Sequence, residues 1–362
     1  MNAPHQLHDL GQSLWLDNIT RGLLNNGTLA NYVRDFSITG LTSNPTIFEH
    51  AIGSTDFYDE AIRVKAEQGQ TGEGLFFELA LEDLRRAADL FDPVFEATGV
   101  DGWVSLEVSP LLAYDAAKTI AAAGKLHARA RRPNLYIKIP GTPEGLLAVE
   151  ESIFAGVPIN VTLLFSGAQY VAAAEAYMRG IERRVAAGRD PIVDCVASLF
   201  VSRWDVAAKP KLPEALKNRL GIAVATLAYR AYREVLRSAR WQRLAAAGAR
   251  PQRLLWASTG TKDPNVPDTF YIAQLAAPDT INTMPEKTLL AYADHGKLVR
   301  TLTLQGGDAD AVLAECRGVG VGEDALAAQL QREGADAFAN SWRSLLKSIA
   351  AKTQTLASAV AR

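Results

Sequence analysis

Residues 135–140 read Leu-Tyr-Ile-Lys-Ile-Pro, a short apolar segment with one charged residue near its centre. Its length and composition are typical of a parallel strand that is buried on both faces. Alternation along a strand places Tyr136 and Lys138 on one face and Ile137 and Ile139 on the other. Lysine is rarely buried without a partner, because removing an ammonium group from water is costly. The segment therefore predicts a core strand that carries one unusual polar group.

Seven other apolar, β-rich segments occur along the chain, and Ala- and Leu-rich helical segments separate them. The eight predicted strands are Leu14–Ile19, Ile38–Asn44, Val104–Ser109, Leu135–Pro140, Ile159–Leu164, Val193–Val201, Arg253–Thr259 and Thr280–Met284. Helices are predicted, among other places, at Gly74–Leu90, Pro110–Ala130, Glu144–Phe154, Gly167–Ala187 and Pro213–Gln242. Strand–helix alternation repeated eight times favours a closed (β/α)8 barrel, and an open doubly wound sheet is the competing α/β architecture.

A chain of 362 residues allows one large α/β domain or two ordinary ones. No repeat or Pro/Ser-rich linker divides it, so we expect a single domain over residues 1–362. The barrel core is expected at about residues 14–285, and residues 286–362 form a helical part that covers the barrel. Within that part, the helically spaced side chains Phe338, Trp342, Leu345 and Leu346 are interpreted as core packing rather than as a ligand site.

The net charge is close to zero, and the N-terminal segment does not resemble a signal peptide. The 38 basic and 40 acidic residues nearly balance, so neither nucleic acid nor an acidic membrane surface is expected as a partner. The basic cluster His127–Arg132 is better explained as a solvated helix end. The N-terminus, residues 1–11, lacks the apolar stretch of a signal peptide, and no apolar run is long enough to cross a bilayer. Two cysteines are too few for a disulfide framework, so we expect a cytoplasmic, soluble protein.

The sequence offers no motif for a metal or a cofactor, and we expect neither. The five histidines are scattered without zinc-ligand spacing. Neither a dinucleotide fingerprint nor a phosphate-binding loop occurs. Cys195 lies in an apolar segment far from any histidine and is interpreted as a small core residue rather than a nucleophile.

Lys138 has two interpretations when its strand is considered alone. A lysine that is neutral near physiological pH is what carbinolamine and Schiff-base chemistry requires. Alternatively, the ammonium group of Lys138 reaches solvent at the strand end or pairs with Glu144.

Polar residues on other predicted strands favour the catalytic interpretation. They interrupt or directly follow apolar runs, at Asp17, Asn44, Glu107, Asn160, Thr162, Ser198 and Arg203. In a barrel, such positions converge at the carboxyl ends of the strands, where enzymes of this architecture place their chemistry. Two carboxylates, a lysine and several amide or hydroxyl groups on converging strands predict a catalytic cluster.

These segments resemble, in order, the signature of the transaldolases. The matching runs are residues 16–17, 42–45, 106–108, 137–140, 159–166 and 197–198, of which Asn-Val-Thr-Leu-Leu-Phe-Ser at 160–166 is a specific signal. The resemblance spans about residues 14 to 285, and residues 256–262 (Trp-Ala-Ser-Thr-Gly-Thr-Lys) are similar to the longer bacterial subfamily. It implies a circularly permuted (β/α)8 barrel of the class I aldolase type and makes a homodimer plausible.

The resemblance also implies catalytic roles. Lys138 would attack the C2 carbonyl of a ketose phosphate and form a Schiff base. Asp17 would take the C4 hydroxyl proton during cleavage. Glu107, with Thr162 and a held water, would shuttle protons while the imine forms.

Further residues would bind the substrate. The dihydroxyacetone moiety would be held by Asn44, Asn160 and Ser198, with Thr42 supporting that layer. Arg203 and Ser258 match the phosphate-binding positions of the family, although Arg203 could instead pair with Asp205. The usual second arginine is Gly260 here, and Lys262 is the candidate that supplies its charge as a point charge rather than a fork.

The implied activity is that of a cofactor-free transferase of aldehyde or ketone residues in the non-oxidative pentose phosphate pathway. A dihydroxyacetone unit would pass from sedoheptulose 7-phosphate or fructose 6-phosphate to glyceraldehyde 3-phosphate or erythrose 4-phosphate. A related aldolase that releases free dihydroxyacetone is the nearest rival, but Glu107 and Phe200 match the transaldolase pattern. A non-catalytic sugar-phosphate-binding barrel is the rival from another class, and the intact Lys138, Asp17 and Glu107 disfavour it.

Overall fold

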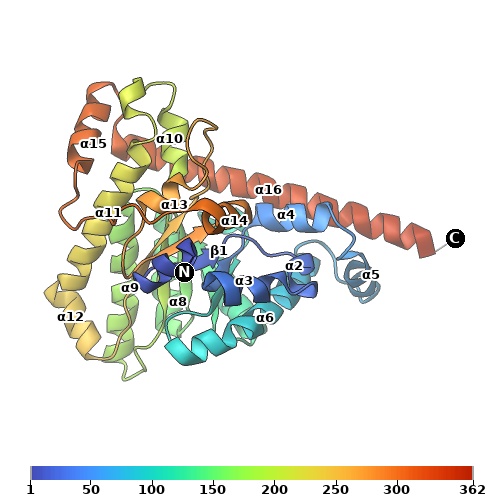
Figure 1. The fold of residues 1–362 in the computed structure, drawn as a ribbon. Helices are drawn as coiled ribbons and strands as arrows, with labels where there is room; N and C mark the ends of the chain where they lie inside the picture. Colours follow the sequence, from blue (N-terminus) through green and yellow to red (C-terminus); the bar gives the residue numbers. More distant parts are fainter. Residues whose placement is uncertain (1, 361–362) are drawn as a thin grey trace.

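Eight parallel strands close into a barrel in a computed structural model that describes residues 2–360 (Figure 1). The strands are β1 (Ser13–Leu16), β2 (Ile38–Thr42), β3 (Trp103–Glu107), β4 (Leu135–Pro140), β5 (Ile159–Leu164), β6 (Cys195–Phe200), β7 (Arg253–Ala257) and β8 (Ile281–Met284). Each strand pairs with its neighbours in chain order, and β1 also pairs with β8. This closure confirms the predicted (β/α)8 barrel and excludes the open doubly wound sheet.

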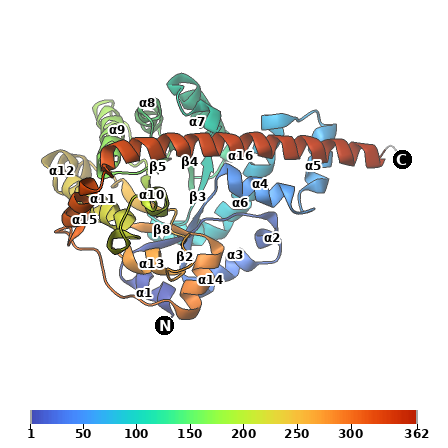
Figure 2. The same cartoon turned by 90° about the horizontal axis from the view of Figure 1, so that it is seen from above.

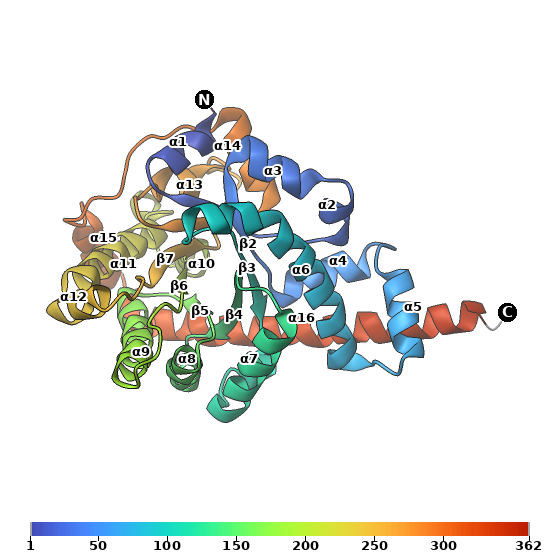
Figure 3. The same cartoon turned by 90° about the horizontal axis from the view of Figure 1, so that it is seen from below.

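Helices surround the barrel and cover one of its ends (Figures 1 and 3). The N-terminal half contains α1 (Ala3–Asp9), α2 (Arg21–Asn25), α3 (Thr28–Phe36), α4 (Pro45–Gly53), α5 (Asp59–Glu67), α6 (Gly72–Thr98), the 3-10 turn η1 (Pro110–Leu112), α7 (Ala116–Ala130), α8 (Pro143–Ala155) and α9 (Gly167–Ala186). The C-terminal half contains α10 (Ser202–Ala208), η2 (Glu214–Leu216), α11 (Leu220–Arg237), α12 (Ala239–Ala246), α13 (Phe270–Gln274), α14 (Glu286–His295), α15 (Ala309–Gly318) and α16 (Glu323–Val360).

Two predicted helices are interrupted, and in each a capping side chain marks the break. The segment Pro110–Ala130 divides because Asp115 accepts a hydrogen bond from the backbone N–H of Lys118 and starts α7 there. The segment Pro213–Gln242 divides because Ser238 caps α12 through the N–H of Trp241. By contrast, α6 continues beyond its predicted end, through Pro93.

The interior of the barrel is filled below its carboxyl end by aromatic side chains. The ring of Tyr136 stacks on Trp103 at 4.0 Å between centroids and lies 6.1 Å from that of Trp15. All three side chains are buried. Because Lys138 follows Tyr136 by two residues on β4, it lies in the next layer toward the carboxyl end.

The long helix α16 crosses the carboxyl end of the barrel (Figure 2). The side chain of Gln331 on this helix donates to the carbonyl oxygens of Gly141 and Leu163, at 2.9 and 3.0 Å. Trp342 and Leu345 of α16 are buried in the core, as the sequence predicted. Within residues 2–360, no helix combines the length and the apolar composition that crossing a membrane requires.

Candidate active site

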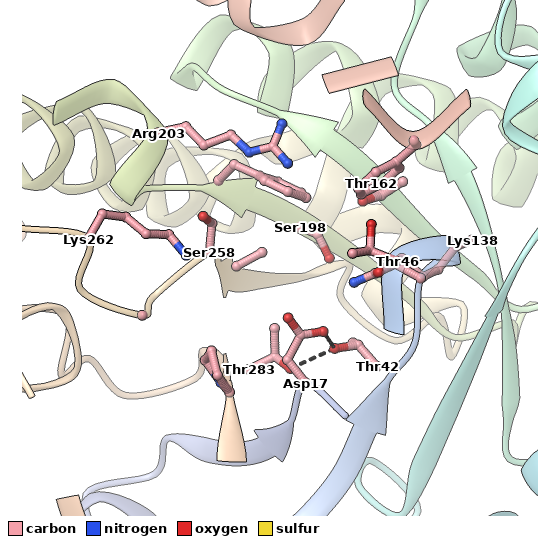
Figure 4. Close-up of a pocket in the computed structure, with 16 residues that line it drawn as sticks. Asp17, Thr42, Thr46, Lys138, Thr162, Ser198, Arg203, Ser258, Lys262 and Thr283 are labelled. Carbon is pink, nitrogen blue, oxygen red and sulfur yellow. Dashed lines mark hydrogen bonds between the residues drawn. The ribbon is translucent and has the colours of Figure 1, made fainter. Parts of the chain in front are cut away.

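A cavity of about 290 Å³ opens at the carboxyl end of the barrel (Figure 4). Strand ends and the loops and helices that follow them form its wall. The lining residues are Asp17, Thr42, Asn44, Thr46, Lys138, Thr162, Ser198, Phe200, Arg203, Ala257, Ser258, Gly260, Lys262, Thr283, Pro285 and Phe338. The cavity thus brings together every predicted site residue except Glu107 and Asn160, which lie directly behind its wall.

Lys138 reaches this cavity from the middle of β4 and is 4% exposed. Its Nζ donates a hydrogen bond to the carbonyl oxygen of Ser43 at 2.9 Å. It also lies 3.5 Å from Oε2 of Glu107, which faces it across the β3–β4 register. The alternative pairing with Glu144 is therefore wrong, and so is the solvated strand end. Lys138 is an enclosed amine beside one carboxylate.

Glu107 is buried beside Lys138, and its carboxylate group lacks hydrogen bonds from the residues that the structure describes. Within residues 2–360, neither carboxylate oxygen has a hydrogen-bond partner, and the contact with Lys138 is longer than an ordinary hydrogen bond. Burial raises the pKa of Glu107 to about 6, and the positive charge of Lys138 opposes this rise. The group is thus poised to exchange a proton with the amine near neutral pH.

Asp17 follows β1 and stands on the opposite side of the cavity from Thr162 (Figure 4). Its Oδ1 accepts a hydrogen bond of 2.7 Å from the hydroxyl of Thr42. Loss of solvation raises the pKa of Asp17, while the charge of Lys138 and the bond from Thr42 lower it. The arrangement suits a general base that must also hold a proton for part of a reaction.

A hydrogen-bonded row joins three strands beneath the cavity. The hydroxyl of Ser198 donates to Oδ1 of Asn160 at 2.7 Å, and Nδ2 of Asn160 donates to Oγ of Ser105 at 3.2 Å. Asn160 therefore orients Ser198. Thr162, two residues further along β5, lines the cavity, and its hydroxyl has no hydrogen-bond partner in the described part of the chain.

The backbone after Thr162 is strained. Leu163 has φ of 60°, in the left-handed region that a leucine seldom adopts, and the β5–β6 register shifts at this point. The side chain of Gln331 on α16 binds the carbonyl oxygen of Leu163 and so helps to hold this conformation. The strained residue directly follows Thr162, which lines the cavity.

Asn44 has a local role as well as a place in the cavity wall. Its Oδ1 accepts a hydrogen bond from the backbone N–H of Ile47 at 3.0 Å and caps α4. The amide oxygen is thereby fixed, which leaves the NH2 group of this residue as the donor available to a ligand.

Arg203 lies in the first turn of α10 and packs against two aromatic rings. Its guanidinium carbon lies 5.3 Å from the ring centre of Phe200 and 5.9 Å from that of Phe338. The suggested pair with Asp205 does not form, because that carboxylate accepts from the Tyr271 hydroxyl at 2.8 Å and from a backbone N–H. Across residues 2–360, no carboxylate makes a salt bridge with Arg203.

Ser258 and Lys262 lie on the same side of the cavity as Arg203, away from Lys138 (Figure 4). Ser258 has φ of 55°, and its hydroxyl lies 2.9 Å from that of Ser202. Gly260 also lines this side, where a Cβ atom would come within 3.1 Å of Pro285. Two cations at one end and an enclosed amine at the other suit an elongated ligand with one anionic end.

Several residues that line the cavity were not predicted from the sequence. Thr283 lies in the predicted strand Thr280–Met284, so its polar side chain in an apolar run was a usable signal. Thr46 follows the strand-end run that contains Asn44. Phe338 was interpreted as core packing, but it lines the cavity besides being buried. Nothing local in the sequence distinguishes it from the other apolar residues of α16.

Comparison with known proteins gives one family match over most of this chain and relatives that align along nearly their whole length. Residues 14–349 match the model of the family described as transaldolase/fructose-6-phosphate aldolase. A transaldolase of Thermobifida fusca is 46% identical over 97% of this chain and 98% of that protein. A transaldolase of Parafrankia sp. is 46% identical over 94% and 95% of the two chains. One of Thiobacillus denitrificans is 45% identical over 96% of this chain and 100% of its own length.

Proposed function

The chain belongs to the transaldolase/fructose-6-phosphate aldolase family, and we propose that it catalyses the transaldolase reaction through a Schiff base on Lys138. A dihydroxyacetone unit moves from sedoheptulose 7-phosphate or fructose 6-phosphate to glyceraldehyde 3-phosphate or erythrose 4-phosphate. The observation that carries this mechanism is the enclosed Nζ of Lys138, 3.5 Å from Glu107, in a cavity that Asp17 and two cationic side chains also line.

Imine formation uses the pair of Lys138 and Glu107. The neutral amine attacks C2 of the ketose and forms a carbinolamine, and the C2 oxygen then leaves as water. Glu107 accepts the proton of the Lys138 ammonium and returns a proton to the departing oxygen, with Thr162 and a bound water as relay. The raised pKa of about 6 lets Glu107 serve in both directions near neutral pH.

Cleavage uses Asp17. Its carboxylate takes the proton of the C4 hydroxyl, the C3–C4 bond breaks, and the electron pair flows into the protonated imine to give an enamine. The aldehyde phosphate leaves. Condensation with the second aldehyde reverses these steps, and hydrolysis of the new imine frees Lys138.

The remaining lining residues hold the two ends of the ketose. Asn44 and Ser198, the latter oriented by Asn160, hydrogen-bond the hydroxyl groups of the dihydroxyacetone part. Arg203, Ser258 and Lys262 bind the phosphate. These three residues lie at the end of the cavity away from Lys138, so the phosphate and C2 of the sugar would lie at opposite ends of it (Figure 4).

Reductive trapping tests the nucleophile. Borohydride added with fructose 6-phosphate is expected to leave a stable dihydroxyacetone adduct on Lys138, located by mass spectrometry. Lys138→Ala should lose both the adduct and turnover. Lys118→Ala is the matched control, because it removes a surface ammonium that pairs with Asp115 at the start of α7, and neither residue lines the cavity. An adduct on another lysine, or none, contradicts the mechanism.

Product analysis tests the reaction. With fructose 6-phosphate and erythrose 4-phosphate, we expect sedoheptulose 7-phosphate and little free dihydroxyacetone. Stoichiometric release of free dihydroxyacetone would instead identify the aldolase activity of the same family.

We also propose that the whole chain is one domain, that it works in the cytoplasm and that it forms a homodimer. These proposals rest on the absence of a linker pattern, on the sequence composition and on the family resemblance. Sedimentation velocity measures the subunit number, and a purely monomeric species would contradict the homodimer.

A further inference from the structure

Thr283 ends a row of three hydrogen-bonded side chains that leads to Asp17 (Figure 4). Its Oγ1 lies 2.7 Å from Oγ1 of Thr42, which in turn lies 2.7 Å from Oδ1 of Asp17. Thr283 lines the cavity from β8, whereas Thr42 belongs to β2 and Asp17 follows β1. Three adjacent barrel strands therefore meet in this row.

The direction of the row follows from the number of protons. An ionised carboxylate only accepts hydrogen bonds, so Thr42 must donate its single hydroxyl proton to Asp17. Thr42 then has no proton left for its second neighbour, and Thr283 must be the donor in the bond between the two hydroxyls. Donors aligned toward a carboxylate strengthen one another and favour its charged form.

Thr283 is held rigidly enough to impose this direction. Its side chain is 2% exposed. Its backbone pairs with Trp15 in the β1–β8 register, and its carbonyl oxygen accepts from the hydroxyl of Thr259 at 2.8 Å. A β-branched residue in a strand has few alternative rotamers, so the hydroxyl of Thr283 stays within reach of Thr42.

We propose that Thr283 is a positioning residue for the proton transfer at Asp17, acting through Thr42. The inference rests on the proposed role of Asp17 as the base of C3–C4 cleavage. With Oδ1 engaged by Thr42, Oδ2 is the oxygen that takes the C4 hydroxyl proton, and the row keeps its direction throughout the cycle.

Other charged groups also influence the pKa of Asp17, so the test must distinguish their effect from that of the hydrogen-bonded row. Lys138 comes from β4, Glu107 from β3, and Lys262 from the loop after β7. Arg203 lines the same cavity from α10. Thr283→Val leaves all of these in place and replaces one hydroxyl with a methyl group of similar size.

The test compares two steps in Thr283→Val and the parent protein. Borohydride trapping with dihydroxyacetone reports imine formation at Lys138 and requires no C–C cleavage, so it should stay within about twofold of the parent. Single-turnover release of glyceraldehyde 3-phosphate from fructose 6-phosphate reports cleavage, and should slow about three- to tenfold. The acid limb of its pH profile should move upward by roughly half a pH unit, because the carboxylate of Asp17 loses support.

Three further variants serve as controls for this interpretation. Thr283→Ser keeps the hydroxyl and should restore both the cleavage rate and the pH profile. Thr39→Val removes a buried hydroxyl on β2 outside the row and should change neither. In a Thr42→Val background, Thr283→Val should have no further effect on the pH profile, since the link to Asp17 is already cut. Thr283→Ala replaces the valine variant in these assays if the latter does not fold.

The outcomes separate this inference from the proposed function. If the parent forms no adduct on Lys138, the proposed function fails. If the parent forms the adduct but Thr283→Val cleaves at the parental rate, or slows both steps equally with an unmoved pH profile, Thr283 is not a positioning residue. A full additional effect in the Thr42→Val background also overturns the inference.

Discussion

Arg203 has its donors free because aromatic rings, and not carboxylates, hold it in place. Phe200 and Phe338 lie against its guanidinium group, and the nearby Asp205 is occupied by Tyr271 and a backbone N–H. Burial lowers the pKa of Arg203, but an arginine remains charged under all physiological conditions. The result is a partly buried cation whose N–H groups have no hydrogen-bond partner among the described residues.

Glu107 predicts a pH dependence of imine formation. Burial raises its pKa to about 6, so the carboxylate that accepts the Lys138 proton predominates above this pH and is lost as the pH falls through it. With dihydroxyacetone and cyanoborohydride, the rate of adduct formation should therefore fall about tenfold per pH unit well below pH 6. Glu107→Gln should be slow and lack this inflection. An unchanged inflection in that variant would assign the titration to another group.

The sequence predicted some of the residues at the site and not others. Lys138, Asp17 and Thr162 interrupt apolar runs, and a closed barrel brings such positions on different strands together at their carboxyl ends. The carbonyl oxygen of Ser43 that binds Lys138 was not predictable, because every residue has such an oxygen and only the tertiary fold selects this one. Phe338 was missed for a similar reason, since an apolar residue that packs and one that lines a cavity look alike in sequence.

At the scale of elements, α16 is part of the active site. Four of its residues face the barrel mouth at helical spacing: Gln331 binds two strand-end carbonyls, Gly334 lies against Leu163 and Arg203, Phe338 lines the cavity and Ser341 binds Thr46. The helix therefore couples the ends of β4 and β5 to the phosphate side of the cavity.

Gln331→Met tests this coupling. The variant keeps the length of the side chain but loses both hydrogen bonds, which leaves the carbonyl oxygens of Gly141 and Leu163 with one partner fewer. We expect a loss of about 1–2 kcal/mol in the free energy of unfolding. We also expect slower adduct formation at Lys138, because Leu163 follows Thr162. Gln329→Met is the control, since Gln329 is exposed on the same helix and binds only Glu333. Equal behaviour of the two variants would show that Gln331 does not support the end of β5 beside the cavity.

Strands were easier to predict than helices in this chain. All eight strands were found because each is a short apolar run between polar segments. Helix ends were less accurate: Asp115 and Ser238 start new helices inside longer periodic segments, and a capping residue also occurs in ordinary helix interiors. The path of α16 across the barrel mouth depends on distant contacts and has no local signal.

At the scale of the whole molecule, the two ends of the barrel have different tasks. At the amino end, Arg253 donates to Oδ1 of Asp101 at 2.9 Å, and Ser13 donates to Oδ2 of the same carboxylate at 2.8 Å. This network lies beyond the aromatic layer from Lys138 and contacts no cavity-lining residue of the active site. It ties β1 and β7 to the segment before β3.

Arg253→Met should therefore separate stability from catalysis. Leaving Asp101 without its cation should cost about 3 kcal/mol in the free energy of unfolding, because both side chains are largely buried. The kcat of the folded variant should remain near that of the parent. Arg219→Met, which breaks a surface pair with Asp308, should cost less than about 1 kcal/mol. Denaturant unfolding and steady-state kinetics measure the two quantities, and a large fall in kcat would contradict the division.

The aromatic layer of Trp15, Trp103 and Tyr136 has a consequence for how ligands reach the cavity. They fill the barrel below the cavity, and the cavity opens at the other end of the barrel, which α16 crosses (Figure 2). In the proposed reaction, the aldehyde that is released and the aldehyde that replaces it therefore use the same end of the barrel. In that reaction the first aldehyde leaves before the second binds, and the three-carbon fragment stays bound to Lys138 in between.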